Sequence, residues 1–188
     1  MGIGKKADPA YIHLMYGLGE LLPYKTYAVF VVALVVAVNV YSGDLPNPVL
    51  TPGAINPAVT QENIASTVCL KGYTKTIRPP ASYTHSLKKK QIRQYGYKDT
   101  NPRDYEEDHL IALSIGGAPY DPHNLWPEPR YSEWGADKKD QLEFAIYTLV
   151  CRRQISLIEA QRAMASDWIA AWKKYVSQGH FANLKTVD

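Results

Sequence analysis

The sequence predicts an α+β fold in which a short pair of strands is followed by two long helices. Tyr105–Ile115 has the pattern of a strand, a break and a second strand, and Gly116-Gly117 closes it with a turn. Ala136–Arg152 carries apolar residues at helical spacing. A further helix starts at Ser156, which forms an S-x-x-E capping box with Glu159.

The first 43 residues differ in composition from the rest of the chain. Ala28–Val38 is an unbroken apolar run of 11 residues, preceded by lysines and followed by Ser42 and Gly43. This order is typical of a secretory signal, and the run is shorter than the roughly 20 apolar residues of a membrane-spanning helix. We expect residues 1–43 to form an apolar N-terminal helix that is either a cleaved signal peptide or a membrane anchor. Either way, the remainder is exported, to the periplasm or medium or held at the membrane.

Residues 44–58 contain four prolines and Gly53, which predicts an extended proline-rich linker. Residues 59–188 then remain for one domain of ordinary size. Within this domain, Cys69 and Cys151 are two cysteines in an exported chain, and an even count favours a disulfide. Two buried free thiols are the alternative.

Shorter elements are expected between the linker and the strand pair. Val59–Ser66 suits a short helix, and Thr67–Ile77 alternates loosely like a strand or hairpin that ends at two prolines. Leu87–Tyr95 predicts a short basic helix with Thr84 or Ser86 as its N-cap. Residues 118–130 contain four prolines and are expected to form a loop.

Charge is unevenly distributed along this domain although the net charge is only +3. Residues 71–103 hold nine basic residues and one acid, and residues 104–108 hold four acids. A basic surface beside carboxylates suits a polyanion that lies next to a metal site. Two solvated faces of opposite sign would give the same pattern.

Asp108 and His109 form the most informative pair of residues. Hydrolysis of a phosphodiester needs a base that takes a proton from water near pH 7, which an imidazole can do. It is helped by a hard cation such as Mg²⁺, which prefers oxygen ligands. Because neighbours on a regular strand point to opposite faces, both side chains can meet one phosphate only if the strand breaks or twists at this pair.

The segment from Asp104 to Glu143 resembles the His-Me finger (ββα-metal, HNH-like) endonucleases. It reads D-H-L-x-x-L-x-x-G-G, then N-L, then a helix, over about 40 residues. The resemblance implies a β-hairpin and a helix that clamp one divalent metal, with His109 as the general base. It implies that Asp108 binds the metal, and that Asn124 fixes the loop that holds the base.

One position departs from the family pattern. The second metal ligand often stands at the start of the helix, where this chain has Gly135. Asp137, Glu143 or Glu128 could replace it, and Glu143 matches a glutamate that holds metal-bound water in related nonspecific nucleases. The implied cofactor is one divalent metal, with Mg²⁺ expected first and Mn²⁺ and Zn²⁺ as alternatives.

The implied partner is nucleic acid, DNA before RNA, bound with little sequence preference because no helix resembles a base-reading element. The basic side chains expected to contact phosphates come from the basic helix, from the loop after it and from the start of the first long helix. They are Lys88, Lys89, Lys90, Arg93, Arg103 and Lys139, with weaker support for Arg78.

Two other classes of function remain open from the sequence. One is a nucleic-acid-binding module whose catalytic site is inactive, which the glycine at position 135 would explain. The other is an envelope-associated interaction protein, anchored by its apolar segment and stiffened by a disulfide. The first would bind nucleic acid without cleaving it, and the second would show no salt-dependent affinity for nucleic acid.

Overall fold

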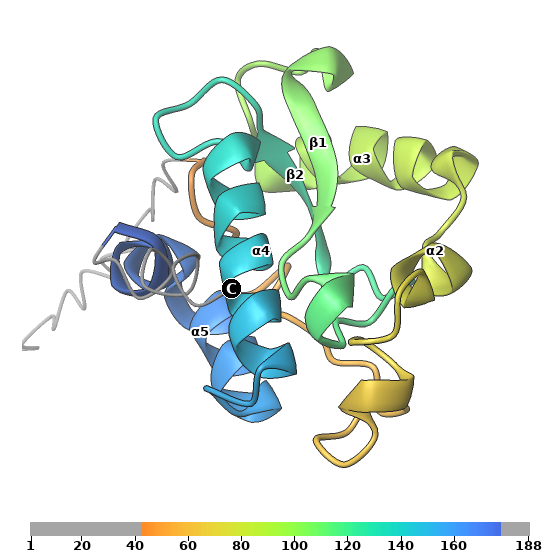
Figure 1. Ribbon diagram of the computed structural model, residues 1–188. Helices are drawn as coiled ribbons and strands as arrows, with labels where there is room; N and C mark the ends of the chain where they lie inside the picture. The colour runs from red at the N-terminus through yellow and green to blue at the C-terminus, as the bar shows by residue number, and fades with distance from the viewer. Residues whose placement is uncertain (1–42, 178–188) are drawn as a thin grey trace, which may run out of the picture. The chain divides into compact units, whose positions relative to one another are not determined.

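A two-stranded antiparallel sheet lies in the middle of the molecule (Figure 1). The structure, a computed structural model, describes residues 43–177. Strand β1 (Tyr105–His109) pairs with strand β2 (Leu125–Pro129), and Asp108 lies opposite Trp126 in the register. Helices surround this hairpin, so the predicted α+β class is confirmed.

The second strand is not where the sequence analysis placed it. Leu113–Ile115 forms a 3₁₀ turn, and β2 comes from the proline-containing stretch that was expected to be a loop. Backbone hydrogen bonds join residues 104 with 130 and 110 with 124, so the even-numbered positions of β1 make the ladder bonds. Pro127 and Pro129 fall at the intervening positions, where no N–H is needed, and the strand therefore tolerates them.

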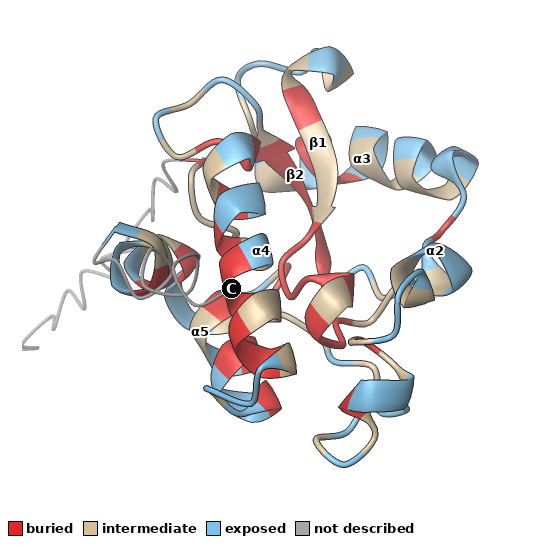
Figure 2. Ribbon diagram, viewed as in Figure 1, coloured by how far each residue is buried: buried red, intermediate tan, exposed pale blue. Residues whose placement is uncertain are grey.

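Helices α4 (Ala136–Cys151) and α5 (Leu157–Trp172) pack against each other on one side of the hairpin (Figure 1). The bounds of α4 were predicted to within one residue, and α5 starts one residue after its predicted start at Ser156. The Ser156 hydroxyl accepts a hydrogen bond from the Glu159 N–H, 3.2 Å away, as the capping box predicts. Their inward faces are buried in Figure 2 and form the core with Trp126 and Ile64.

Helix α3 (Ala81–Tyr95) lies on the other side of the hairpin (Figure 1). It starts directly after Pro80, so it is longer than the predicted basic helix and neither Thr84 nor Ser86 caps it. Its buried Gln91 donates to the carbonyl of Leu125 at 2.8 Å, which ties the helix to β2. The helix otherwise presents charged residues outward, and its Lys88 reaches the carbonyl of Tyr105 at 2.9 Å.

The prediction of a strand or hairpin over Thr67–Ile77 is wrong. The chain forms a short helix, α2 (Tyr73–Ile77), after Gly72 in the left-handed conformation, and the predicted helix before it is only a 3₁₀ turn, Ile64–Ser66. The side chain of Asn63 closes local turns with Thr60 and Thr67, and such bonds compete with strand pairing.

Residues 44–58 pack along the domain, contrary to the predicted free linker. Thr51 is buried and donates to the carbonyl of Leu125, and the Tyr95 hydroxyl donates to Thr51. Ile55 forms an isolated antiparallel bridge with Gly117. The segment contains a turn at residues 48–50, and its backbone finds hydrogen-bond partners on the loops beside the hairpin.

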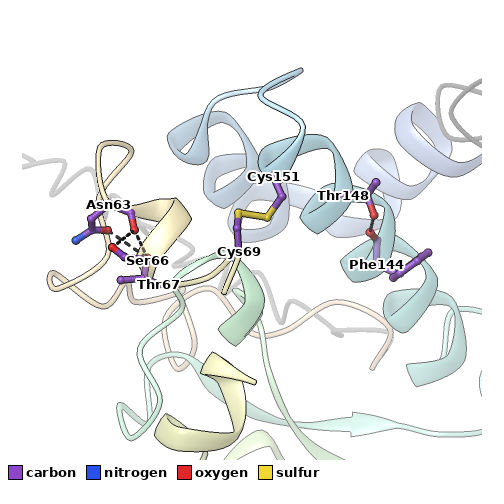
Figure 3. The surroundings of a disulfide bond; sticks show 7 residues. All are labelled: Asn63, Ser66, Thr67, Cys69, Phe144, Thr148 and Cys151. Atoms are coloured by element: carbon purple, nitrogen blue, oxygen red, sulfur yellow. Dashed lines mark hydrogen bonds between the residues drawn. A yellow bond between two sulfur atoms is a disulfide. The ribbon is translucent and has the colours of Figure 1, made fainter. Parts of the chain in front are cut away.

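A disulfide joins Cys69 to Cys151 at the end of α4, as predicted (Figure 3). It links residues 82 positions apart, and closing so long a loop stabilises the fold by about 4 kcal/mol on the chain-entropy model. The predicted apolar helix and signal or anchor lie almost wholly outside the described residues. Within residues 43–177, no helix is both long enough and apolar enough to cross a membrane.

Candidate active site

The side chains of β1 point to two opposite faces of the hairpin. Asp108 points toward α4, where it contacts Lys139. Glu107 and His109 line a cleft on the face that α3 covers in part. The strand continues regularly through Asp108 and His109, so it does not bring these two side chains to one point, and a pocket shared by both is not formed.

His109 lies at the end of β1 and forms part of the cleft wall, although only 4% of the residue is exposed. Its Nε2 is 3.0 Å from the carbonyl oxygen of Pro119. A carbonyl can only accept, so Nε2 carries the hydrogen and Nδ1 of the neutral ring keeps a free lone pair. Burial lowers the pKa of His109, and the opposing effect of Asp108 is smaller. The ring is therefore neutral near pH 7.

The cleft has a volume of about 310 Å³ and lies between β1, the start of α3 and the residues that follow β2. Cationic side chains form much of its wall. They are Arg78, Lys88 and Arg130, with His85 beside them. The guanidinium of Arg130 pairs through one nitrogen, at 2.7 Å, with Glu106, which also lines the cleft, so its remaining N–H groups and the other cations can face an incoming anion.

Glu107 places a buried carboxyl group in the wall of this cleft. Both of its oxygens are buried and have no hydrogen-bond partner within the described residues. Burial raises the pKa of Glu107 to about 8, and the neighbouring Lys88 only partly offsets this effect. A carboxyl that is buried without a partner is protonated at neutral pH, and it can ionise when a cation is bound beside it.

Asn124 is fully buried and does not reach the cleft. Its side chain accepts from the N–H of Ile111 at 2.9 Å and donates to the carbonyls of Ile111 and Ala118 at 3.0 and 3.1 Å. These bonds hold the loop that leads to Pro119, whose carbonyl orients His109. Asn124 is therefore a positioning residue, which is the role that the resemblance implies.

Gly117 permits the same loop to close. A Cβ atom at this position would lie 1.7 Å from the carbonyl oxygen of Ile111, so no other residue fits without moving the backbone. The Gly-Gly turn singled out in the sequence thus serves to bring the Asn124 and Pro119 segments together. The turn is a requirement of the loop rather than the closing of a second strand.

On the opposite face of β1, Lys139 is wholly buried between the hairpin and α4. Its ammonium group donates to Asp108, to Glu143 and, at 2.8 Å, to the backbone carbonyl of His109. Its predicted role as a phosphate contact is wrong, because a side chain with no exposure cannot reach a phosphate. We call Lys139, Asp108, Glu143 and the adjacent Glu128 the lysine cluster.

The lysine cluster gathers three carboxyl groups around one ammonium group, and both oxygens of Glu128 lack a hydrogen-bond partner within the described residues. Burial acts to raise the pKa of Asp108, but the ammonium of Lys139 more than offsets it and the pKa ends below its usual value. Burial raises the pKa of Glu143 to about 7, opposed by the same ammonium. Burial also raises the pKa of Glu128, and the pKa of Lys139 is well above its usual value because three carboxyl groups outweigh its burial.

The predicted metal ligands do not fit a divalent cation in this arrangement. Asp108 and Glu143 already bind an ammonium group, and Asp137 is exposed, two positions from Lys139 and so on the far side of α4. A side-chain ligand at position 135 is excluded because a Cβ there would lie 2.6 Å from the carbonyl oxygen of Arg130. Residues 43–177 also contain no group of three His, Cys, Asp or Glu side chains arranged to hold a metal.

The other predicted phosphate contacts divide into two sets. Lys88 lines the cleft, and Lys89 and Arg103 line a second cavity beside it. Lys90 and Arg93 are exposed on α3 and line neither cavity. Arg130 was not among the predicted phosphate contacts, and alternation along β1 places Glu107 on the same face as His109.

Comparison with known proteins adds no further constraint: no protein-family model, curated protein sequence or solved structure matches this chain.

Proposed function

We propose that this protein hydrolyses phosphodiester bonds of nucleic acid, as an endonuclease with His109 as its general base. The observation that carries the proposal is the state of this ring. Its Nε2 is held by the carbonyl of Pro119, its Nδ1 has no partner within the described residues, and it lines a cleft that also holds three cationic side chains and two glutamates. To activate water next to a phosphate, a neutral imidazole takes a proton from the water while nearby cationic side chains stabilise the phosphate.

The order of elements also supports a ββα-metal type of core. Two antiparallel strands are followed directly by a helix, the histidine ends the first strand, and the asparagine fixes the loop behind it. This is the arrangement that the resemblance to His-Me finger nucleases implies. The likeness concerns the order and the roles of residues, and the catalytic cleft that we propose lies on the α3 side of the hairpin.

In the proposed reaction, Arg78, Lys88 and Arg130 bind the phosphate and stabilise its growing negative charge. Nδ1 of His109 takes a proton from a water molecule, and the resulting hydroxide attacks phosphorus. The bond to the leaving oxygen breaks, and that oxygen takes a proton, so that the products are a phosphate monoester and an alcohol. The carbonyl of Pro119 keeps the ring oriented throughout.

A divalent cation, Mg²⁺ before Mn²⁺ or Zn²⁺, is part of the proposal, with Glu107 in place of the predicted ligands. The two unpartnered oxygens of Glu107 suit a hard cation, because Mg²⁺ commonly uses one or two carboxylates and completes its shell with water and substrate phosphate. When bound, the cation would neutralise charge on the phosphate and the leaving oxygen.

The test is cleavage by the purified full chain of labelled single-stranded and double-stranded DNA and of RNA, with Mg²⁺ and with EDTA. We expect cleavage that His109→Ala lowers by about 10²- to 10⁴-fold. His123→Ala is the matched control, because His123 is an exposed loop histidine whose side chain contacts Asp121 and does not line the cleft. Equal cleavage by wild type and His109→Ala would overturn the proposal.

The lysine cluster favours a second candidate, a nucleic-acid-binding module without catalysis. Lys139 binds Oδ2 of Asp108, an oxygen of the carboxylate that the resemblance assigns to a metal. The same experiment separates the two candidates: salt-dependent binding without hydrolysis under any metal condition would favour the module.

We also propose that the domain functions outside the cytoplasm. The disulfide between Cys69 and Cys151 supports this, because disulfides persist in oxidising compartments. The intact mass of the exported protein would distinguish a signal cleaved near Ser42 from a retained membrane anchor.

A further inference from the structure

A second cavity adjoins the His109 cleft and shares three of its walls. This cavity, which we call the Arg103 pocket, has a volume of about 350 Å³. His85, Lys88 and Arg130 line both cavities. A polymer bound in the His109 cleft would therefore extend directly into the Arg103 pocket.

The charge of the Arg103 pocket is of one sign. Its charged wall residues are Lys88, Lys89, Arg103 and Arg130, and no carboxyl group lines it. Lys89 and Arg103 are exposed, and no residue within the described range forms an ion pair with either. Burial and, to a smaller extent, the nearby Arg130 lower the pKa of Lys88, and Glu107 and Glu106 oppose this effect.

Two elements from different parts of the sequence create this concentration of charge. Positions 85, 88 and 89 of α3 share one helix face because they are three and four residues apart. The 3₁₀ turn Pro102–Asp104 then brings Arg103 opposite that face. Pro102 and Tyr105 add apolar wall, so the pocket offers cationic groups for a phosphate and apolar surface for a sugar or base.

We infer that the Arg103 pocket is a second phosphate subsite, which binds the nucleotide next to the scissile phosphate through Arg103 and Lys89. The inference rests on the proposed nuclease function and deepens it: the preferred substrate is a polynucleotide strand, not a dinucleotide or another small diester. Arg103 and Lys89 set this preference for length, and His109 performs the chemistry in the neighbouring cleft.

The experiment compares kcat/KM of the full chain on a dinucleotide and on a 12-residue oligonucleotide of the same sequence type. The variant is the double substitution Arg103→Gln with Lys89→Gln. Lys90→Gln is the matched control, because it is an exposed lysine of the same helix that lines neither cavity. Thermal unfolding of each variant verifies that the fold is unchanged.

We expect the double variant to lose about tenfold or more in kcat/KM on the oligonucleotide, mainly through KM, and to stay within about twofold on the dinucleotide. The slope of log affinity for the oligonucleotide against log salt should fall by about 1 for each phosphate contact removed. Lys90→Gln should change neither. Equal losses on both substrates, or no loss on either, would overturn the subsite.

Failure of the nuclease proposal has a different signature. If the wild-type chain hydrolyses nothing, fluorescence anisotropy with the same labelled oligonucleotide still measures the subsite. Weaker binding by the double variant than by Lys90→Gln would then support the Arg103 pocket as a binding site while refuting catalysis. Equal binding by the two variants would refute both.

Discussion

The two faces of strand β1 carry the same kinds of groups, but one face is sealed and the other opens into a cleft. Toward α4, Asp108 and Glu143 bind Lys139, which has no exposure, and Glu128 beside them is buried without a hydrogen-bond partner in the described residues. Toward α3, Glu107 and His109 line a cleft, and within residues 43–177 the Glu107 oxygens and Nδ1 of His109 have no hydrogen-bond partner. The face toward α4, which we call the closed face, thus holds the hairpin to its helix. The face toward α3, which we call the open face, keeps groups available to bind or react.

The largest expected effect concerns catalysis on the open face. His109→Ala should lower kcat by about 10²- to 10⁴-fold, whereas Asp108→Asn should retain catalysis per folded molecule. Because burial holds the pKa of His109 below its usual value, wild-type kcat/KM should stay high to below pH 6.5 and fall only when the pH passes the lowered pKa. A pH–rate profile checks both points, and a loss with Asp108→Asn equal to that with His109→Ala would assign the chemistry to the closed face.

The next largest effect concerns stability on the closed face. Lys139→Met should lower the free energy of unfolding by about 3–5 kcal/mol, because it leaves the buried carboxylates of Asp108 and Glu143 without their cation. Adding Asp108→Asn to this variant removes one of the two orphaned charges and should restore part of the loss. Urea denaturation of the three variants measures this, and a double variant that is less stable than Lys139→Met would contradict the closed-cluster interpretation.

Local sequence signals predict individual helices and side-chain roles better than they predict which residues pack together in space. The helix bounds near residues 136 and 157, the Cys69–Cys151 pair and the loop-fixing role of Asn124 follow from local signals such as caps, spacing and motif. The direction in which each β1 side chain points also follows from alternation. Which element covers each face does not, because that is decided by packing between segments that are distant in the sequence.

Lys139 and the second strand show this limit most clearly. Lys139 reads as a surface lysine beside another lysine, and only the approach of β1 to α4 converts it into a buried cation. Residues 125–129 read as a loop because of their prolines, and only the hydrogen-bond register of the hairpin shows that these positions need no N–H. Both errors arise from treating a local preference as if no partner could override it.

A pH-dependent effect on stability is expected at Glu107. Its folded-state pKa of about 8 is above the unfolded value of 4.5, so its contribution to stability is complete below pH 4.5 and is lost as the pH rises through 8. Glu107→Gln stays neutral, so the variant should gain stability relative to wild type over this interval, by at most about 5 kcal/mol. Thermal unfolding in EDTA at pH 5 and pH 9 measures the difference, and a gap that does not change with pH would contradict a buried, unpartnered carboxyl.

The same pair of proteins tests the cation site by a readout other than activity. If Glu107 holds Mg²⁺, adding Mg²⁺ at pH 8 should raise the unfolding temperature of wild type and leave Glu107→Gln unchanged. Asp108→Asn should respond to Mg²⁺ as wild type does. A response that disappears with Asp108→Asn and persists with Glu107→Gln would return the cation to the closed face.

The smallest expected effect compares an ion pair on the open face with those of the closed face. Arg130 and Glu106 are joined at 2.7 Å, but about 40% of each side chain is exposed, so solvent screens the pair. Arg130→Gln should change the unfolding free energy by less than about 1 kcal/mol, against the 3–5 kcal/mol expected for Lys139→Met. Because Arg130 also lines both cavities, the same substitution should raise KM and reduce the salt dependence of nucleic-acid binding. A large loss of stability with no change in KM would mean that Arg130 belongs to the framework of the fold, and that charge on the two faces of β1 is not divided between structure and binding.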